Sequence, residues 1–234
     1  MTLGCYNQGV GRINLLIANA NQKFTKSELA VMKRAAKSAE KFISNNFDFD
    51  YEVDLIITSP SFLMGTILED GISGRTYSSR LIILVIDKRE AIISEDVIFE
   101  TICHEMSHSL RWEKLPEYSK TLFDSVIMEG LAIVLEEKAM EDTGREKKQF
   151  FLKEMQNTDQ AAIDRLISQL SESFDEEQYD YDTIFYTGNE GQPRWAGYRL
   201  GYYLVKEYLA RTGIPLSQAT LASYDSFKSP NQSV

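Results

Sequence analysis

The chain has few of the residues that cross-link a fold or bind a metal. Its 234 residues include only two cysteines, Cys5 and Cys103, and two histidines. Two cysteines are too few for a disulfide framework, so the fold must depend on a hydrophobic core. We expect Cys103 to be a core residue rather than a redox group or metal ligand, because free cysteine packs as a small apolar side chain.

Long hydrophobic runs are also missing. No stretch approaches the roughly 18 apolar residues of a membrane span, and the N-terminus lacks the basic region and apolar core of a signal peptide. The opening MTLGC is only faintly similar to a lipoprotein cleavage site, because no apolar run precedes it. We therefore expect a cytoplasmic protein without a membrane span.

Positive charge is scarce. Acidic residues outnumber basic ones 35 to 25, which gives a net charge of −10, and no Lys/Arg cluster overrides this excess. The balance argues against nucleic acid or an anionic membrane as a partner and favours neutral or basic substrates. With 43% apolar residues, the chain can form one domain or two lobes about a cleft.

Both histidines stand in one run, TICHEMSHSL, which contains the pattern HExxH. On a helix, His104 and His108 share a face, so both imidazoles can reach one metal ion at about 2.0–2.1 Å. Glu105, about 100° further round the helix, can reach a water on that metal rather than bind it. HExxH is the signature of zinc hydrolases. The alternative is two histidines at the surface or core edge with no metal.

The flanking sequence predicts strands and helices in alternation, and then mainly helices. Thr25 and Glu28 form a capping box that opens a helix, and Ser94, followed by two acids, opens the HExxH helix. Pro116 ends that region, and Gly144 follows the next helix. Strands are expected at 13–18, 51–58 and 81–86, and helices from 25, at 94–112, at 121–142 and from about Pro193.

The segment GISGRTYSSR lies before the third strand and is rich in Gly and Ser. We interpret it as a flexible turn leading into an edge strand, whose free backbone groups would hold an extended peptide. An ordinary hairpin linker is the alternative.

A catalytic zinc usually has three protein ligands, and no further histidine is available. Glu113, Asp124 and Glu129 are candidates for the third. Glu129 lies in SVIMEGLAIVL, where a carboxylate on so apolar a surface needs a cation or metal to accept it. A buried Glu–Arg pair is the alternative. Gly130, inside the same helix, suggests the close approach of another element.

HExxH followed by EGLA at 129–132, with GYRLGYYLV near the C-terminus, resembles the gluzincin zinc peptidases. The chain is most similar to a family of predicted zinc-dependent proteases of unknown function. That resemblance implies that His104, His108 and Glu129 bind one Zn²⁺ ion and that Glu105 is the general base. The better-known gluzincins carry an aspartate where this chain has Ile133, so Glu136, one turn further, is our candidate to orient a histidine.

The oxyanion of peptide hydrolysis needs a second donor besides the metal, and without another histidine a tyrosine must supply it. Tyr198 is our choice, because Gly197 and Gly201 would let its helix approach the site. Tyr186 and Tyr202 are rivals, and a packing role is the alternative for all three. Arg194, Trp195 and Arg199 either shape a substrate pocket or are solvated and core positions.

These observations predict a zincin-like α+β fold: a twisted mixed sheet with the HExxH helix in an N-terminal lobe, residues 1–115, and a mainly helical lobe, residues 116–234. The predicted function is a zinc peptidase acting on peptides or proteins. A zinc-binding regulatory module without turnover is the alternative, but it would have no use for Glu105 as a base. A metal-free scaffold is the other, and buried Glu129 argues against it.

Overall fold

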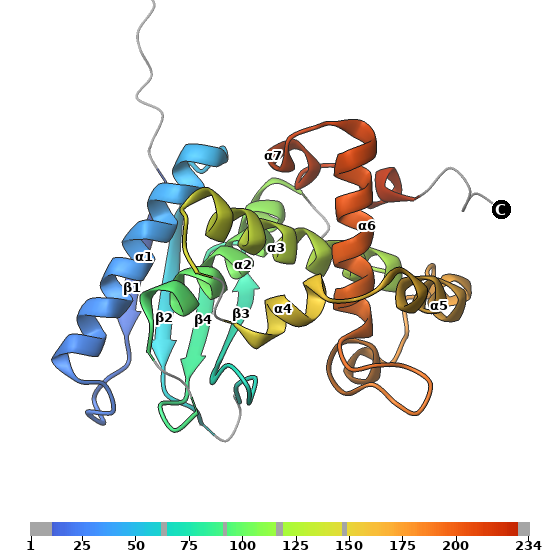
Figure 1. Cartoon of the computed structure of the whole chain (residues 1–234). Helices are drawn as coiled ribbons and strands as arrows, with labels where there is room; N and C mark the ends of the chain where they lie inside the picture. The colour runs from blue at the N-terminus through green and yellow to red at the C-terminus, as the bar shows by residue number, and fades with distance from the viewer. Residues whose placement is uncertain (1–10, 62–64, 91–92, 116–118, 147–148, 229–234) are drawn as a thin grey trace, which may run out of the picture.

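The computed structural model describes residues 11–61, 65–90, 93–115, 119–146 and 149–228. Within them, a sheet with two long helices is followed by a part built of helices (Figure 1). The strands are β1 (Arg12–Ile17), β2 (Glu52–Thr58), β3 (Ile72–Ser78) and β4 (Leu81–Ile86). The helices are α1 (Lys26–Asn46), α2 (Glu95–Lys114), α3 (Leu122–Asp142), α4 (Phe150–Gln156), α5 (Gln160–Leu170), α6 (Ala196–Thr212) and α7 (Leu216–Ala219), with short turns η1 (Ser171–Ser173), η2 (Thr183–Thr187) and η3 (Tyr224–Phe227). The predictions for Cys5 and Pro116 lie outside the described residues.

The sheet is mixed, as predicted, with strand order β1-β2-β4-β3. Strands β1, β2 and β4 are parallel, and β3 is antiparallel to β4 at the edge. The prediction that 81–86 is the edge strand is wrong, because that strand, β4, lies inside the sheet. The Gly/Ser-rich segment before it is itself the edge strand. Its glycine and serines hid an alternation in which Ile72 is buried and Arg75 is exposed.

Two capping boxes set where the long helices begin. Thr25 and Glu28 form the predicted one at α1. At α3 the side chain of Thr121 accepts a bond from the Asp124 backbone N–H, and the Asp124 carboxylate accepts one from the Thr121 N–H. These reciprocal bonds satisfy amide groups that the first helical turn leaves without partners. The Asp124 carboxylate therefore caps the start of α3.

Helix α2 is buried along most of its length, because it packs against α1, α3 and strand β3. Cys103 has no exposed surface on this helix, as expected of a core cysteine. Ser94 occupies the N-cap position but makes no capping bond there. The acids that follow it, Glu95 and Asp96, instead pair with Arg145 at 3.0 and 2.6 Å, which ties the start of α2 to the segment after α3.

Helices α3 and α6 cross in contact at two glycines (Figure 1). A Cβ atom on Gly130 would lie 2.2 Å from the carbonyl oxygen of Gly201, so only hydrogen fits at this crossing. The close approach predicted from Gly130 and Gly201 is thus confirmed. The helix predicted to start near Pro193 is α6, which begins three residues later, at Ala196, because Trp195 adopts a left-handed conformation with φ of 64°. It is not the last helix, since α7 follows it.

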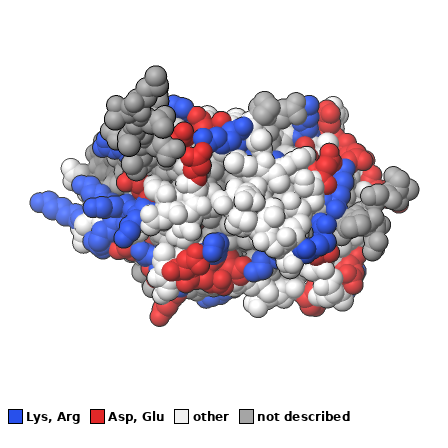
Figure 2. All heavy atoms as spheres, turned by 90° about the horizontal axis from the view of Figure 1, so that it is seen from above, with Lys and Arg blue, Asp and Glu red and all other residues white. Residues whose placement is uncertain are grey.

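In the face seen in Figure 2, Lys and Arg gather at the left edge, and charges of both signs alternate elsewhere around a broad uncharged area. None of the helices in the described parts of the chain combines the length and the apolar character needed to cross a membrane.

Candidate metal centre

Helices α2 and α3 bring three side chains together: His104, His108 and Glu129. One ligand atom from each lies within 4.8 Å of the others, so the trio could hold a metal ion. The Nε2 atoms of both histidines are 3.4 Å from Oε2 of Glu129. All three side chains are largely buried, with Glu129 only 5% exposed. The predicted HExxH-plus-glutamate cluster is therefore present.

The donor set fits zinc. In a tetrahedral site with bonds of about 2.0–2.1 Å, two ligand atoms lie about 3.3–3.4 Å apart. The two His–Glu separations have this length, which is long for a hydrogen bond. Oε2 of Glu129 is buried and makes no hydrogen bond. Two imidazoles and one carboxylate oxygen that converge without bonding one another are what a divalent cation requires.

The negative charge of Glu129 also favours a bound cation. Burial opposes ionisation of this carboxyl, but the positive charge that His108 and His104 carry when their imidazoles are protonated outweighs burial and lowers its pKa to about 2. The group is therefore an anion that needs positive charge in front of it. A zinc ion supplies that charge while leaving both histidines neutral, as metal ligation requires.

Glu136 supports the site from behind. Its Oε2 lies 2.7 Å from Nδ1 of His104, on the side of the ring opposite the metal-facing Nε2. A carboxylate in this place fixes the ring and makes Nε2 a better ligand. It thus takes the place expected of it from the helical spacing, one turn beyond Ile133.

Tyr181 is a neighbour of Glu129 that sequence reasoning missed. Its hydroxyl donates to Oε1 of Glu129 at 3.3 Å. It comes from the acidic segment 171–182, which docks on α3 because Tyr179 also bonds Ser125, at 2.6 Å. A tyrosine among six acids gives no sequence signal of burial, since its partner lies 52 residues away.

Glu105 is not part of the metal-facing trio, as expected from its position on the helix. Its side chain points toward strand β3. The hydroxyl of Thr76 lies 2.8 Å from its Oε2. Only 5% of Glu105 is exposed, yet it lines a cavity beside the trio. A carboxylate beside the metal-binding trio and open to this cavity can exchange a proton with a water or substrate there.

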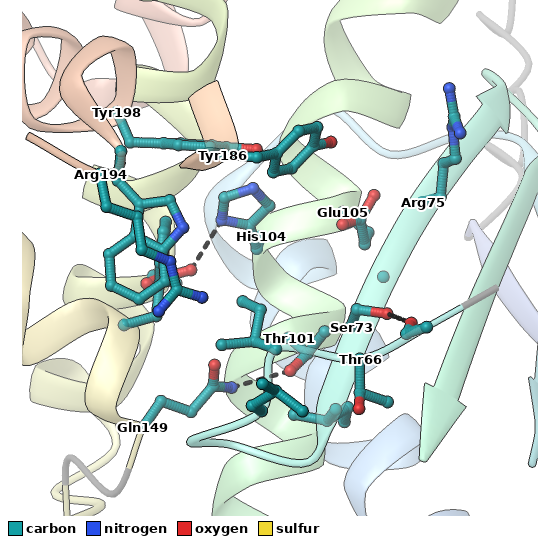
Figure 3. A pocket seen from close by; sticks show the side chains of 18 of the residues that line it. Thr66, Ser73, Arg75, Thr101, His104, Glu105, Gln149, Tyr186, Arg194 and Tyr198 are labelled. Atoms are coloured by element: carbon teal, nitrogen blue, oxygen red, sulfur yellow. Dashed lines mark hydrogen bonds and ion pairs between the residues drawn. The ribbon is translucent and has the colours of Figure 1, made fainter. Parts of the chain in front are cut away.

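The cavity has a volume of about 680 Å³, and Figure 3 shows it between strand β3 on one side and the segments around Tyr186, Arg194 and Tyr198 on the other. His104 and Glu105 lie in its wall, and Gln149 bonds Thr101 at 2.8 Å within it. The apolar part of the lining comprises Ile67, Leu68, Ile72, Phe151 and Trp195. The volume suits a few residues of a peptide.

Of the three tyrosines considered from sequence, two line this cavity. Tyr198 is 9% exposed, and burial together with the negative charge of Glu129 raises the pKa of its hydroxyl well above 10. Tyr186 lies at the same cavity and is 48% exposed. Both keep their protons at neutral pH and can donate a hydrogen bond. Tyr202 instead donates to Glu137 at 2.8 Å.

The other candidates separate clearly. Glu113 pairs with Arg80 at 2.5 Å and Asp124 caps α3, so neither joins the trio. Arg194 and Trp195 line the cavity, where the guanidinium lies 3.8 Å from the centre of the indole ring. Arg199 bonds Glu154 at 2.8 Å and has a structural role.

A family model described as "Predicted Zn-dependent protease (DUF2268)" matches residues 12–229, which takes in the sheet and the helices that carry the trio. The chain belongs to this family of predicted Zn-dependent proteases. Membership agrees with the family resemblance carried by HExxH and EGLA. No curated protein and no solved structure matches the chain.

Proposed function

We propose that this predicted Zn-dependent protease is an active zinc peptidase of zincin-like fold, with His104, His108 and Glu129 as the ligands of one zinc ion. The observation that carries the proposal is the pair of 3.4 Å separations between Oε2 of Glu129 and the two imidazoles. Residues 1–115 and 116–234 would form two lobes of one catalytic unit, with the metal centre between α2 and α3.

When bound, zinc lowers the pKa of a water toward neutrality and polarises the substrate carbonyl. Glu105 takes the proton of the attacking water on its carboxylate and passes it to the amine as the peptide bond breaks. Tyr198 donates its hydroxyl proton in a hydrogen bond to the oxygen that gains negative charge. Because both groups stand in the wall of one cavity, they can act on the same peptide bond.

Strand β3 gives the peptide a place to lie. Within the described residues, the segment before β3 reaches its first two residues, through the isolated bridge between Ile67 and Ile72 and the bond from the Ser73 hydroxyl to the Gly65 carbonyl at 2.7 Å, and no strand pairs with the outer edge beyond them. An extended peptide can add to this edge through backbone hydrogen bonds, which depend little on its sequence. Glu105 would then lie on the α2 side of the bound peptide backbone.

The test compares the parent with Glu105→Gln and Glu129→Ala. We expect about one zinc per chain in the parent and in Glu105→Gln, with cleavage of a mixed peptide library by the parent alone. Glu129→Ala should lose its metal on dialysis against a mild chelator, because two histidines remain as ligands. Zinc without cleavage in the parent would identify a binding module instead. Undiminished zinc in Glu129→Ala would reassign the third ligand.

A further inference from the structure

Two residues of strand β3 are shaped around the side chain of Glu105. The Thr76 hydroxyl lies 2.8 Å from Oε2 of Glu105 and 3.0 Å from its backbone oxygen. A Cβ atom on Gly74 would lie 2.5 Å from both Cγ and Oε1 of the same glutamate. One position therefore contacts the carboxylate through a hydroxyl, and the other leaves room for it.

The alternation of a strand explains why these two residues act together. Residues two apart point to the same face, so Gly74 and Thr76 both face α2. Their partners on β4, Leu84 and Ile82, are completely buried on that face. Strand β3 therefore contacts the HExxH helix at Glu105, and the Glu105 side chain packs against the strand.

We propose that Thr76 and Gly74 are positioning residues for Glu105, which rests on the proposed role of Glu105 as base. A glutamate side chain has three rotatable bonds, and a proton-transfer group must be held in one arrangement to be effective. The Thr76 hydroxyl fixes the position of Oε2, and the absence of a side chain at Gly74 lets Oε1 lie close to the strand. The strand that binds the peptide therefore also fixes the position of the Glu105 carboxylate.

The first test replaces the hydroxyl without changing the shape. Thr76→Val should lower kcat by about 10- to 100-fold, because a misplacement of about 1 Å costs that much. KM and the zinc content should stay at parental values. Thr76→Ser keeps the hydroxyl and should recover most of the kcat. Thr58→Val on β2 is the matched control, since the only hydrogen bond of its hydroxyl among the described residues goes to the Ser59 carbonyl, and it should behave as the parent.

A second readout does not depend on activity. In crystal structures of the metal-free variants, the Glu105 side chain should be displaced in Thr76→Val and in Gly74→Ala, and unmoved in Thr76→Ser. Gly74→Ala should still fold, because the added methyl meets the flexible end of a side chain rather than backbone. An unmoved Glu105 in both variants, or full kcat in Thr76→Val, would overturn the proposal. A parent that cleaves nothing would instead overturn the proposed function, and the crystallographic result would still stand.

Arg75, between these two residues, supports a separate inference about the substrate. It points to the opposite face of β3, is exposed and lines the cavity (Figure 3). The ring of Tyr77, two residues on, lies 5.6 Å from its guanidinium. In the described parts of the chain no carboxylate pairs with Arg75, whereas Arg80 on the adjoining turn pairs with Glu113. The other arginine in the cavity lining, Arg194, pairs with Glu69 at 2.6 Å, so Arg75 is the cation of this lining that is left for a bound ligand.

We infer that Arg75 selects peptides that carry an acidic side chain next to the Arg75 guanidinium when the peptide is bound along β3. Side chains directly opposite in paired strands are about 4.5–5.5 Å apart at Cβ, and opposite charges there attract. This local preference reverses the expectation of neutral or basic substrates from net charge. It rests on the proposed binding of peptides along β3.

Binding is measured in the Glu105→Gln background, so that no peptide is consumed. The probes are extended peptides with Glu or Lys placed at each position in turn, all with amidated C-termini. At one position Glu should bind about 2- to 5-fold more tightly than Lys, and Arg75→Glu should reverse that order. The control Arg165→Glu makes the same charge change on an exposed residue of α5. A preference for Glu that survives in Arg75→Glu, or that is lost equally in Arg165→Glu, would overturn the inference. A library that does not bind at all would overturn peptide binding along β3.

Discussion

Nδ1 of His104 lies 2.7 Å from Oε2 of Glu136, a residue 32 positions further along the chain. The bond joins α2 to α3 directly behind the metal-facing side of the ring. With zinc bound, a carboxylate in this position would hold the proton on Nδ1, which would leave the lone pair of Nε2 for the metal. Glu136 lies seven residues after Glu129, two turns along the same face of α3.

Removing this carboxylate should weaken metal binding. We expect Glu136→Gln to raise the dissociation constant for zinc about 10- to 100-fold, because a neutral amide orients and polarises the imidazole less well. Competition with a chromogenic chelator measures the constant. Glu137→Gln is the control, since Glu137 pairs with Lys206 at 2.7 Å. Equal zinc affinity in the two variants would contradict the assignment.

Tyrosine substitutions should separate the candidates for the oxyanion donor. Tyr198→Phe removes one hydroxyl and should lower kcat about 100- to 1000-fold, the usual loss for one such donor, with KM and zinc content preserved. Tyr202→Phe should leave kcat near the parental value, because that hydroxyl bonds Glu137. A large loss in Tyr186→Phe and none in Tyr198→Phe would transfer the role to Tyr186.

The sequence predicted the parts of the site that are set within one helix. His104, Glu105 and His108 follow from spacing alone. Glu136 was proposed because it lies one helical turn beyond Ile133, the position at which the similar gluzincins carry an aspartate. Glu129 itself could be inferred because a carboxylate in an apolar stretch needs a partner. Each of these arguments uses residues close in sequence.

Residues that reach the site from distant segments were not predictable. Thr76 and Tyr181 contact Glu105 and Glu129 across 29 and 52 residues, and their side chains are common ones. Strand β3 was taken for a turn because Gly74 is required by contact with Glu105, not by the local backbone. A glycine at this contact interrupts the alternation of apolar and polar residues by which a strand is recognised in a sequence.

The crossing of α3 and α6 should tolerate no side chain. In Gly130→Ala the new methyl group would meet the backbone of Gly201 at 2.2 Å, so the helices must separate or bend. We expect a loss of about 1–3 kcal/mol or more in the free energy of unfolding, measured by chemical denaturation. Gly65→Ala is the control, because no heavy atom lies within 4 Å of its added methyl. Similar stability in both variants would show that the crossing can adjust.

Glu100 should make stability depend on pH. It has no exposed surface, and neither carboxyl oxygen makes a hydrogen bond. Burial, and then the charges of Glu136 and Asp70, raise its pKa to about 9, while the backbone N–H of Gln149 and the charge of His104 act in the opposite direction. The folded protein therefore keeps a proton that the unfolded chain, with an ordinary glutamate, releases above about pH 4.5.

Because the folded state binds the extra proton, this group lowers the free energy of unfolding as pH rises from about 4.5 toward 9. Glu100→Gln cannot ionise, so its stability should fall less over that range. We expect the variant to exceed the parent by roughly 4–5 kcal/mol at pH 8, and by about 1 kcal/mol or less at pH 5. Denaturation at both pH values, on zinc-loaded protein, measures the difference. Parallel pH profiles would mean that Glu100 is charged in the folded protein, held by a partner that burial alone does not reveal.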